Sequence, residues 1–279
     1  MTLREMALSG EPLENELVID AHMHPHRLAM FFSPSDIGAT VNKMDRIGIK
    51  CGILSKLYDV GNLGRQEDVL RILEEYPGRF YGYITPDPHR DDFLKELEKW
   101  AKVPRFAGIK LHPGEAQKPL DCKEYLIAYA FGAERSLPVL IHTWGMADIA
   151  AVEKLVVNFP RAVLIIGHSG GERNAAEYAI KLAGDYENVY LDTTRTFCYN
   201  NEITKMIEGA TDRKILFGSD ATWNSMEAAI GRILLEDIPD ESKRRIIGQN
   251  AKEVFSLEVW QSGQKKIPAT RLSGPLPRT

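Results

Sequence analysis

The stretch Ile19-Asp20-Ala21-His22-Met23-His24-Pro25 decides how the rest of the sequence is interpreted. Side chains alternate across a β-strand, so His22 and His24 point to one face and the apolar residues point to the other. Two imidazoles two positions apart are costly to bury unless one group compensates both, and a divalent metal ion does so economically. For this pair alone a structural role is the alternative, and the other strands must decide.

Length and composition favour one domain that acts on small molecules. The chain has 279 residues, a size that single-domain α/β barrels commonly reach. Its 35 Lys and Arg against 39 Asp and Glu give a net charge of −4, so no basic field favours nucleic acid or an anionic membrane as a partner. The three cysteines are far apart and form no C-x-x-C motif, which is typical of reduced thiols in the cytoplasm.

Eight short apolar runs alternate with longer segments of helical periodicity. The predicted strands are residues 17–24, 50–56, 80–86, 106–112, 138–144, 162–168, 188–194 and 214–220. The predicted helices are residues 36–47, 66–76, 91–101, 123–136, 147–159, 172–183, 201–209, 226–235 and 242–255. Strand–helix alternation predicts a parallel sheet, and eight such units predict a closed (β/α)8 barrel, the TIM-barrel fold, in place of an open sheet.

The sequence contains no linker between two cores and no repeat beyond the strand–helix unit. We therefore expect a polar N-terminal lead-in over residues 1–16, without a signal peptide or membrane span. A single barrel domain follows over 17–257, and a C-terminal tail or arm without apolar periodicity covers 258–279. The tail and an apolar run at 28–32 are features that a homodimer would use.

Polar side chains gather at the carboxyl ends of the predicted strands. Five of the seven histidines lie there: His22, His24, His112, His142 and His168. Asp220 closes the eighth predicted strand, and Lys110 shares one strand face with His112. In a closed barrel these ends converge on one mouth, where active sites form. Imidazoles with one carboxylate favour Zn²⁺, with Mn²⁺ and Fe²⁺ as alternatives.

Each of these residues also has an ordinary structural role open to it. A single strand-end histidine is more often hydrogen-bonded in the core. Asp220 could cap the helix that follows it, although Ser225 is better placed for that cap. Lys110 could pair with Asp20, Asp192 or a substrate carboxylate. The coincidence of so many polar residues at equivalent strand ends favours the metal site.

Several strand-end segments together resemble a known superfamily. They are IDAHMH, GIKLHP, PVLIHT, LIIGHSGG and ILFGSDAT, with the late segment IIGQNAKEVF. They resemble the amidohydrolase superfamily, specifically its amidohydrolase-related group of metal-dependent hydrolases and decarboxylases, over nearly all of residues 17–257. The resemblance implies a distorted barrel with metal ligands His22, His24, His142 and Asp220. It also implies that His168 binds a second metal or holds water or substrate at a single one.

The fourth strand decides the number of metal ions. In two-metal members of the group a carbamylated lysine or a glutamate bridges the ions from this strand, and Lys110 could be that lysine. We favour one ion, Zn²⁺ first, and two only if Lys110 is carbamylated. His112 and Lys110 are then candidate substrate contacts. Arg195 could clamp a substrate carboxylate, and Trp144 could line the pocket.

The leading functional hypothesis is a cytoplasmic metal-dependent hydrolase of a small cyclic amide, lactone or ester. The metal would activate a water, Asp220 would pass its proton to the leaving group, and His168 or His142 would stabilise the oxyanion. One alternative is a non-oxidative decarboxylase of an aromatic or enol-type carboxylic acid that uses the same ligands. The other is a barrel that binds metal without catalysis.

Overall fold

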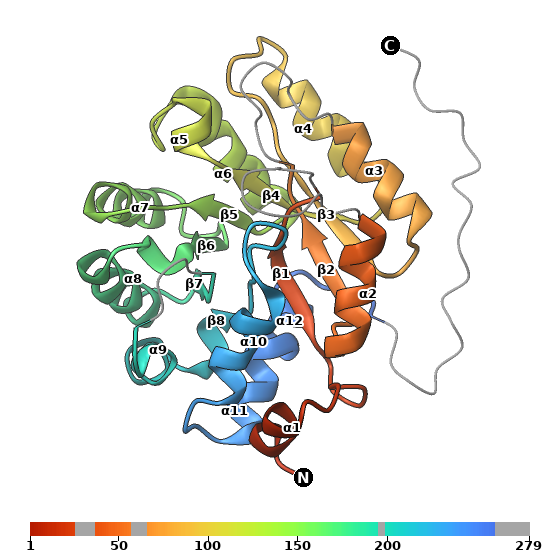
Figure 1. Ribbon diagram of the computed structural model, residues 1–279. Helices are drawn as coiled ribbons and strands as arrows, with labels where there is room; N and C mark the ends of the chain where they lie inside the picture. The colour runs from red at the N-terminus through yellow and green to blue at the C-terminus, as the bar shows by residue number, and fades with distance from the viewer. Residues whose placement is uncertain (26–36, 57–65, 195–198, 260–279) are drawn as a thin grey trace.

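Eight parallel strands form one sheet in chain order, and helices surround it (Figure 1). The computed structural model describes residues 1–25, 37–56, 66–194 and 199–259. The strands are β1 (Ile19–Met23), β2 (Cys51–Leu54), β3 (Phe80–Ile84), β4 (Phe106–Leu111), β5 (Val139–His142), β6 (Leu164–Gly167), β7 (Val189–Asp192) and β8 (Ile215–Leu216). The predicted (β/α)8 barrel is confirmed.

Backbone hydrogen bonds between β1 and the chain that follows β8 join the two ends of the sheet. The Ala21 amide donates to the Phe217 carbonyl and the Asp220 amide donates to the His22 carbonyl, each over 2.8 Å. β8 has two residues, fewer than the predicted 214–220, because the chain then leaves the β7 ladder for these contacts with β1. The last strand end therefore lies directly against the first.

The helices alternate with the strands, and their apolar faces pack against the sheet in one large core. They are α1 (Leu3–Ser9), α2 (Ile37–Ile47), α3 (Gln66–Glu75), α4 (Phe93–Ala101), α5 (Pro113–Ala116), α6 (Lys123–Arg135), α7 (Met146–Asn158), α8 (Arg173–Asp185), α9 (Glu202–Ala210), α10 (Met226–Leu234), α11 (Asp240–Arg244) and α12 (Asn250–Val254). The predicted cap of α10 is confirmed, because the Ser225 hydroxyl accepts from the Ala228 amide over 3.2 Å. None of these described helices is long and apolar enough to cross a membrane.

The N-terminal lead-in contains a helix that the sequence interpretation did not assign. Thr2 and Glu5 form a capping box at the start of α1. Leu3 and Leu13 are buried, and the Leu3 amide donates to Asp240 Oδ2 at the start of α11 over 3.0 Å. Figure 1 shows α1 beside α10 and α11 at one end of the molecule. This part of the chain therefore packs against the barrel.

The helix predicted over 242–255 is interrupted by a π-helical turn at Arg245–Gln249, between α11 and α12. Within that turn the Ile246 carbonyl accepts from the Phe217 amide, just after β8, over 2.9 Å. This hydrogen bond fixes the backbone just after β8, in the segment that leads to Asp220. The widened turn also brings its backbone close to Leu17, before β1, so that a residue without a side chain is needed at position 248.

We predict that Gly248→Ala destabilises the protein by about 1–3 kcal/mol. A Cβ at Gly248 would lie 1.9 Å from the Leu17 carbonyl oxygen, a backbone atom that cannot move aside. Gly231→Ala is the matched control, because a Cβ there meets nothing within 4 Å, and alanine favours a helix interior by about 0.5–1 kcal/mol over glycine. Urea unfolding followed by circular dichroism measures both variants, and equal stabilities would contradict this packing.

Candidate metal centre

Three side chains from the first and last strand ends direct their ligand atoms toward one another. His22 lies on β1, His24 follows that strand, and Asp220 follows β8. One ligand atom from each of the three lies within 4.8 Å of the others. Asp220 Oδ1 is 3.0 Å from His24 Nε2 and 3.9 Å from His22 Nε2. We call this group the His-His-Asp cluster.

Hydrogen bonds at Nδ1 orient both imidazoles of the cluster. His22 Nδ1 donates to Asp192 Oδ2 over 2.7 Å, and His24 Nδ1 donates to the Ser55 carbonyl over 2.9 Å. These two hydrogen bonds fix the orientation of the rings and direct Nε2 of both imidazoles toward Asp220. Metal-ligating histidines are commonly oriented in this way by a carboxylate or a backbone carbonyl.

Asp192, at the carboxyl end of β7, connects three parts of the site. Besides His22, its carboxylate accepts from the backbone amides of His168 over 2.7 Å and Thr194 over 3.2 Å. Burial raises the pKa of Asp192 to about 7, although the attraction of Lys110 opposes that rise. The sequence interpretation named Asp192 only as a candidate partner of Lys110 and missed this role. Its place at a strand end is the signal that could have found it.

Lys110 lies on β4 with an exposed fraction of 1 % and Nζ only 2.9 Å from His22 Nε2. Desolvation by burial lowers its pKa to about 8, against the attraction of Asp192 and Asp220. In the described part of the chain, no ion pair within 4.0 Å joins Lys110 to Asp20 or Asp192, the partners proposed from sequence. Its contact is with the cluster itself.

Three more histidines lie beside the cluster. The rings of His112 and His142 stack with centroids 3.7 Å apart, and the His142 and His168 rings meet edge to face at 4.4 Å. Burial lowers the pKa of all three imidazoles well below the ordinary value, so they are neutral near pH 7. His142, predicted as a metal ligand, lines the same cavity as His24 and Asp220 but is not a member of the His-His-Asp cluster. His112 also caps α5, because its Nδ1 accepts from the Glu115 amide.

Asp220 differs from the other buried acids in its charge state. Burial acts to raise its pKa, but the hydrogen bond from His24 and the nearby imidazoles and Lys110 outweigh burial and leave the pKa below the ordinary value. Asn224 Nδ2 donates to Oδ2 over 3.2 Å. Asp220 is therefore an ionised carboxylate with one oxygen at the imidazoles and the other held by an amide.

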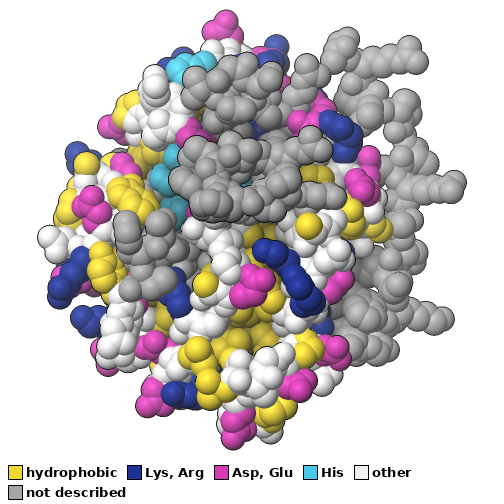
Figure 2. All heavy atoms as spheres, viewed as in Figure 1, with side chains coloured by type: hydrophobic (Ala, Val, Ile, Leu, Met, Phe, Trp, Pro, Cys, Tyr) yellow, Lys and Arg dark blue, Asp and Glu magenta, His cyan; other side chains and the backbone are white. Residues whose placement is uncertain are grey.

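A cavity of about 160 Å³ opens onto these groups. Its lining residues are His24, Lys110, His112, Glu115, His142, His168, Asp220 and Trp223. Glu115 was not singled out from sequence, because its helix α5 has only four residues and gives no periodic signal. Figure 2 shows histidine side chains reaching the surface on the side that carries β5 and β6, with hydrophobic side chains beside them.

Trp144, a predicted substrate contact, lies at the edge of the site. The Trp144 ring is 39 % exposed and 6.0 Å from the His168 ring. It lies over Gly171, where a Cβ would come within 2.5 Å of the indole. Arg195 lies outside the described residues.

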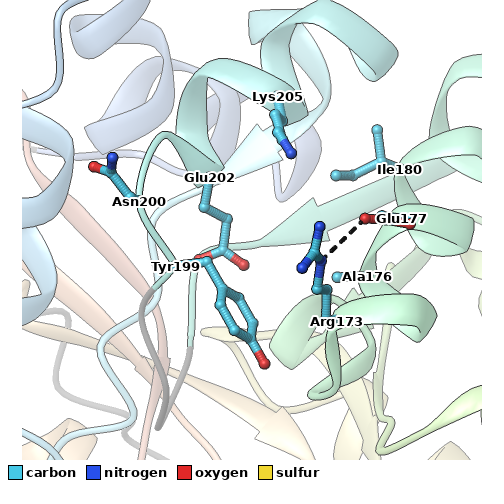
Figure 3. Close-up of a pocket in the computed structure, with 8 residues that line it drawn as sticks. All are labelled: Arg173, Ala176, Glu177, Ile180, Tyr199, Asn200, Glu202 and Lys205. Carbon is cyan, nitrogen blue, oxygen red and sulfur yellow. Dashed lines mark hydrogen bonds and ion pairs between the residues drawn. The ribbon is translucent and has the colours of Figure 1, made fainter.

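A separate groove of about 260 Å³ lies between α8 and α9 (Figure 3). Arg173 and Lys205 point into it from the two helices, and Arg173 pairs with Glu177 over 3.4 Å. Its lining shares no residue with the histidine cavity. None of the strand-end residues predicted for the site lines this groove.

The comparison with protein families gives one match. The profile of the family described as Amidohydrolase matches residues 59–257. The matched range contains Asp220 and the strands from β3 to β8, but it begins after the two histidines at β1. No curated protein matches the sequence.

Solved structures with the same fold cover most of the chain. An uncharacterized TIM-barrel protein from Bordetella bronchiseptica has a TM-score of 0.74 at 16 % identity, covering 86 % of this chain and 98 % of its own. A 5-carboxyvanillate decarboxylase from Novosphingobium aromaticivorans was solved in complex with manganese and 4-hydroxy-3-methoxy-5-nitrobenzoic acid. It has a TM-score of 0.63 at 14 % identity, and the match covers 88 % of this chain and 97 % of the decarboxylase. A probable 2-pyrone-4,6-dicarboxylic acid hydrolase from Acinetobacter baumannii has a TM-score of 0.62 at 15 % identity, and the match covers 86 % of this chain and 99 % of the hydrolase.

We predict that Asp192→Ala destabilises the metal-free protein by about 3 kcal/mol or more, because three buried donors lose their acceptor together. Asp148→Ala is the control. Asp148 accepts from the Trp144 amide at the surface, and the loss of such a cap costs about 1 kcal/mol. Urea unfolding in the presence of a chelator measures both. A cost for Asp192→Ala no larger than that of the control would contradict its connecting role.

Proposed function

The chain belongs to the amidohydrolase family, and from that premise we propose that it is a metal-dependent hydrolase of small cyclic amides, lactones or esters. The observation that carries the proposal is the convergence of His22, His24 and Asp220 at the mouth of the barrel. Active sites of this fold form at the carboxyl ends of the strands, which is where the cluster lies.

The chemistry of the cluster fits a divalent transition metal ion. Burial lowers the pKa of the His22 imidazole, so that this ring is neutral and has a lone pair to give. Two nitrogen ligands with one carboxylate suit Zn²⁺, Mn²⁺ or Fe²⁺. We propose one ion, Zn²⁺ first, because the described residues contain one such cluster; a second ion would require a carbamate at Lys110. When bound, the ion supplies Lewis acidity that lowers the pKa of water and polarises a carbonyl group.

Asp220 is the proposed general base. Its lowered pKa keeps it ionised at neutral pH, as a group that removes a proton from water must be. The carboxylate would then return the proton to the leaving nitrogen or oxygen of the substrate. Asn224 limits its rotation by donating to Oδ2.

His142 and His168 are proposed to stabilise the oxyanion. Both are neutral imidazoles on the wall of the cavity, and a neutral ring donates a hydrogen bond without the cost of burying a charge. His112, Lys110 and Trp144 are proposed substrate contacts. The small cavity and its stacked rings suit a small, flat substrate.

Decarboxylation is the second candidate, and the position of Lys110 favours it. Lys110 places a buried amine on the wall of a cavity that also carries the stacked His112 and His142 rings. An aromatic or enol-type carboxylic acid would present a flat ring to those imidazoles and its carboxylate to the amine. A homodimer and a cytoplasmic location stay predictions from the sequence.

We expect Zn²⁺ or Mn²⁺ to raise the melting temperature of chelator-treated wild-type protein. A ligand at 100 times its dissociation constant stabilises by about 2.7 kcal/mol. His24→Ala and Asp220→Ala should abolish the shift, because each removes one cluster ligand. His89→Ala should retain it, since His89 donates to the Ala116 carbonyl away from the cluster. Differential scanning calorimetry measures the shift in melting temperature. The proposed metal site would be contradicted by no shift in the wild type, or by a shift in His24→Ala equal to that of the wild type.

We expect the metal-loaded protein to hydrolyse members of a panel of lactones, cyclic amides and esters. Asp220→Asn should lower kcat by about 10²–10⁴-fold, the usual contribution of a general base. The same panel should contain hydroxylated aromatic acids, with CO₂ measured beside acid release. Release of CO₂ without any hydrolysis would replace the hydrolase proposal by the decarboxylase, and turnover unaffected by Asp220→Asn would remove Asp220 from the mechanism.

A further inference from the structure

Arg232 connects helix α10 to the end of β7, next to Asp192. Its Nη1 donates to the Thr193 carbonyl over 3.0 Å, and its Nη2 donates to Glu202 Oε2 on α9 over 2.6 Å. The two charged side chains are mostly buried, with exposed fractions of 16 % and 7 %. An arginine whose fork is fixed by a buried carboxylate has little freedom to move. The Thr193 carbonyl is therefore held by a rigid donor.

Thr193 is fixed from its other side by β8. Its amide donates to the Leu216 carbonyl over 2.9 Å, and the Gly218 amide donates to its hydroxyl over 3.2 Å. Thr193 thus lies between Arg232 on one side and the strand end that leads to Asp220 on the other. Arg232 holds the carbonyl of the Thr193–Thr194 peptide, and the amide of the same peptide donates to Asp192 Oδ1 over 3.2 Å, so this peptide fixes the direction in which the Asp192 carboxylate points.

We propose that Arg232 and Glu202 are positioning residues for the metal centre, which act through Thr193 and Asp192 on His22. The inference rests on the proposed function and adds to it two residues that do not line the histidine cavity. Without the guanidinium, the end of β7 can shift and the His22 ring loses its fixed orientation. Loss of an outer hydrogen-bond partner of a metal ligand typically weakens metal binding about 10–100-fold.

An open groove reaches the ion pair from outside. Arg232, Glu202, Gly231 and Ala228 line a groove of about 460 Å³ between α9 and α10. Glu202 and Tyr199 also line the neighbouring groove (Figure 3). A small planar cation such as guanidinium can therefore reach the space that a shortened side chain at position 232 would leave. Added guanidinium can therefore replace the missing group in a folded variant, whereas it cannot restore metal binding to a variant that has lost its fold.

The test compares Arg232→Ala with Arg244→Ala. Arg244 also pairs with a carboxylate through its fork, that of Glu16 at 3.0–3.2 Å, but neither residue contacts the β7 end. Zn²⁺ titration of chelator-treated protein by calorimetry should give a dissociation constant about 10-fold or more weaker for Arg232→Ala. Arg244→Ala should bind as the wild type does. Millimolar guanidinium should restore affinity to Arg232→Ala and leave the wild type unchanged.

A metal-free readout separates this inference from the proposed function. The proton on His22 Nδ1, bonded to Asp192, should give a downfield resonance in the ¹H NMR spectrum of the chelator-treated protein. We expect that resonance to shift or broaden in Arg232→Ala and to return with guanidinium. If the wild type binds no Zn²⁺, the metal proposal fails, and the NMR comparison still decides the role of Arg232.

Wild-type Zn²⁺ affinity and an unchanged His22 resonance in folded Arg232→Ala would overturn the positioning role. Equal weakening in Arg244→Ala, or no rescue by guanidinium, would also overturn it, since the effect would then be one of general stability. If Arg232→Ala does not fold, Arg232→Lys and Glu202→Gln replace it. Both keep most of the side-chain volume, but Arg232→Lys loses the planar fork and Glu202→Gln loses the charge that fixes it. Each should therefore weaken Zn²⁺ binding, while Arg244→Lys does not.

Discussion

The site depends on the hydrogen bond from the Asp220 amide to the His22 carbonyl, 2.8 Å long, which joins the last strand end to the first. Nearly two hundred residues separate these two positions in the chain, and the barrel in between determines that they meet. In the π-helical turn at 245–249, the Ile246 carbonyl accepts a hydrogen bond from the Phe217 amide and so fixes the backbone just after β8. The acid and the two imidazoles therefore converge because the sheet closes.

The same convergence concentrates ionisable groups in a buried space, and burial determines their charge states. Desolvation raises the pKa of Asp192 to about 7 and lowers that of Lys110 to about 8, while the histidines beside them become neutral. Both shifts reduce the charge held away from water. A bound cation would favour the ionised carboxylates and use the neutral imidazoles as ligands, which is why this composition suits a metal centre better than a purely structural core.

The sequence predicted the barrel well because each strand is a short apolar run bounded by turn residues, and periodicity detects such runs directly. The strand-end residues His22, His24 and Asp220 could be chosen because their place on parallel strands implies a common mouth. Helix α1 and the four-residue α5 were missed because they are too short for periodicity to be clear. The stacking of His142 on His112, and the roles of Asp192 and Arg232, depend on side-chain directions between distant elements, which no local pattern encodes.

The most direct measurement is an anomalous-difference map from crystals of Zn²⁺-loaded protein, recorded above and below the zinc absorption edge. The account predicts one strong peak that lies roughly 2.0–2.2 Å from His22 Nε2, His24 Nε2 and an Asp220 carboxylate oxygen. A peak bound by other residues, or none within bonding distance of these three atoms in protein that has taken up zinc, would contradict it.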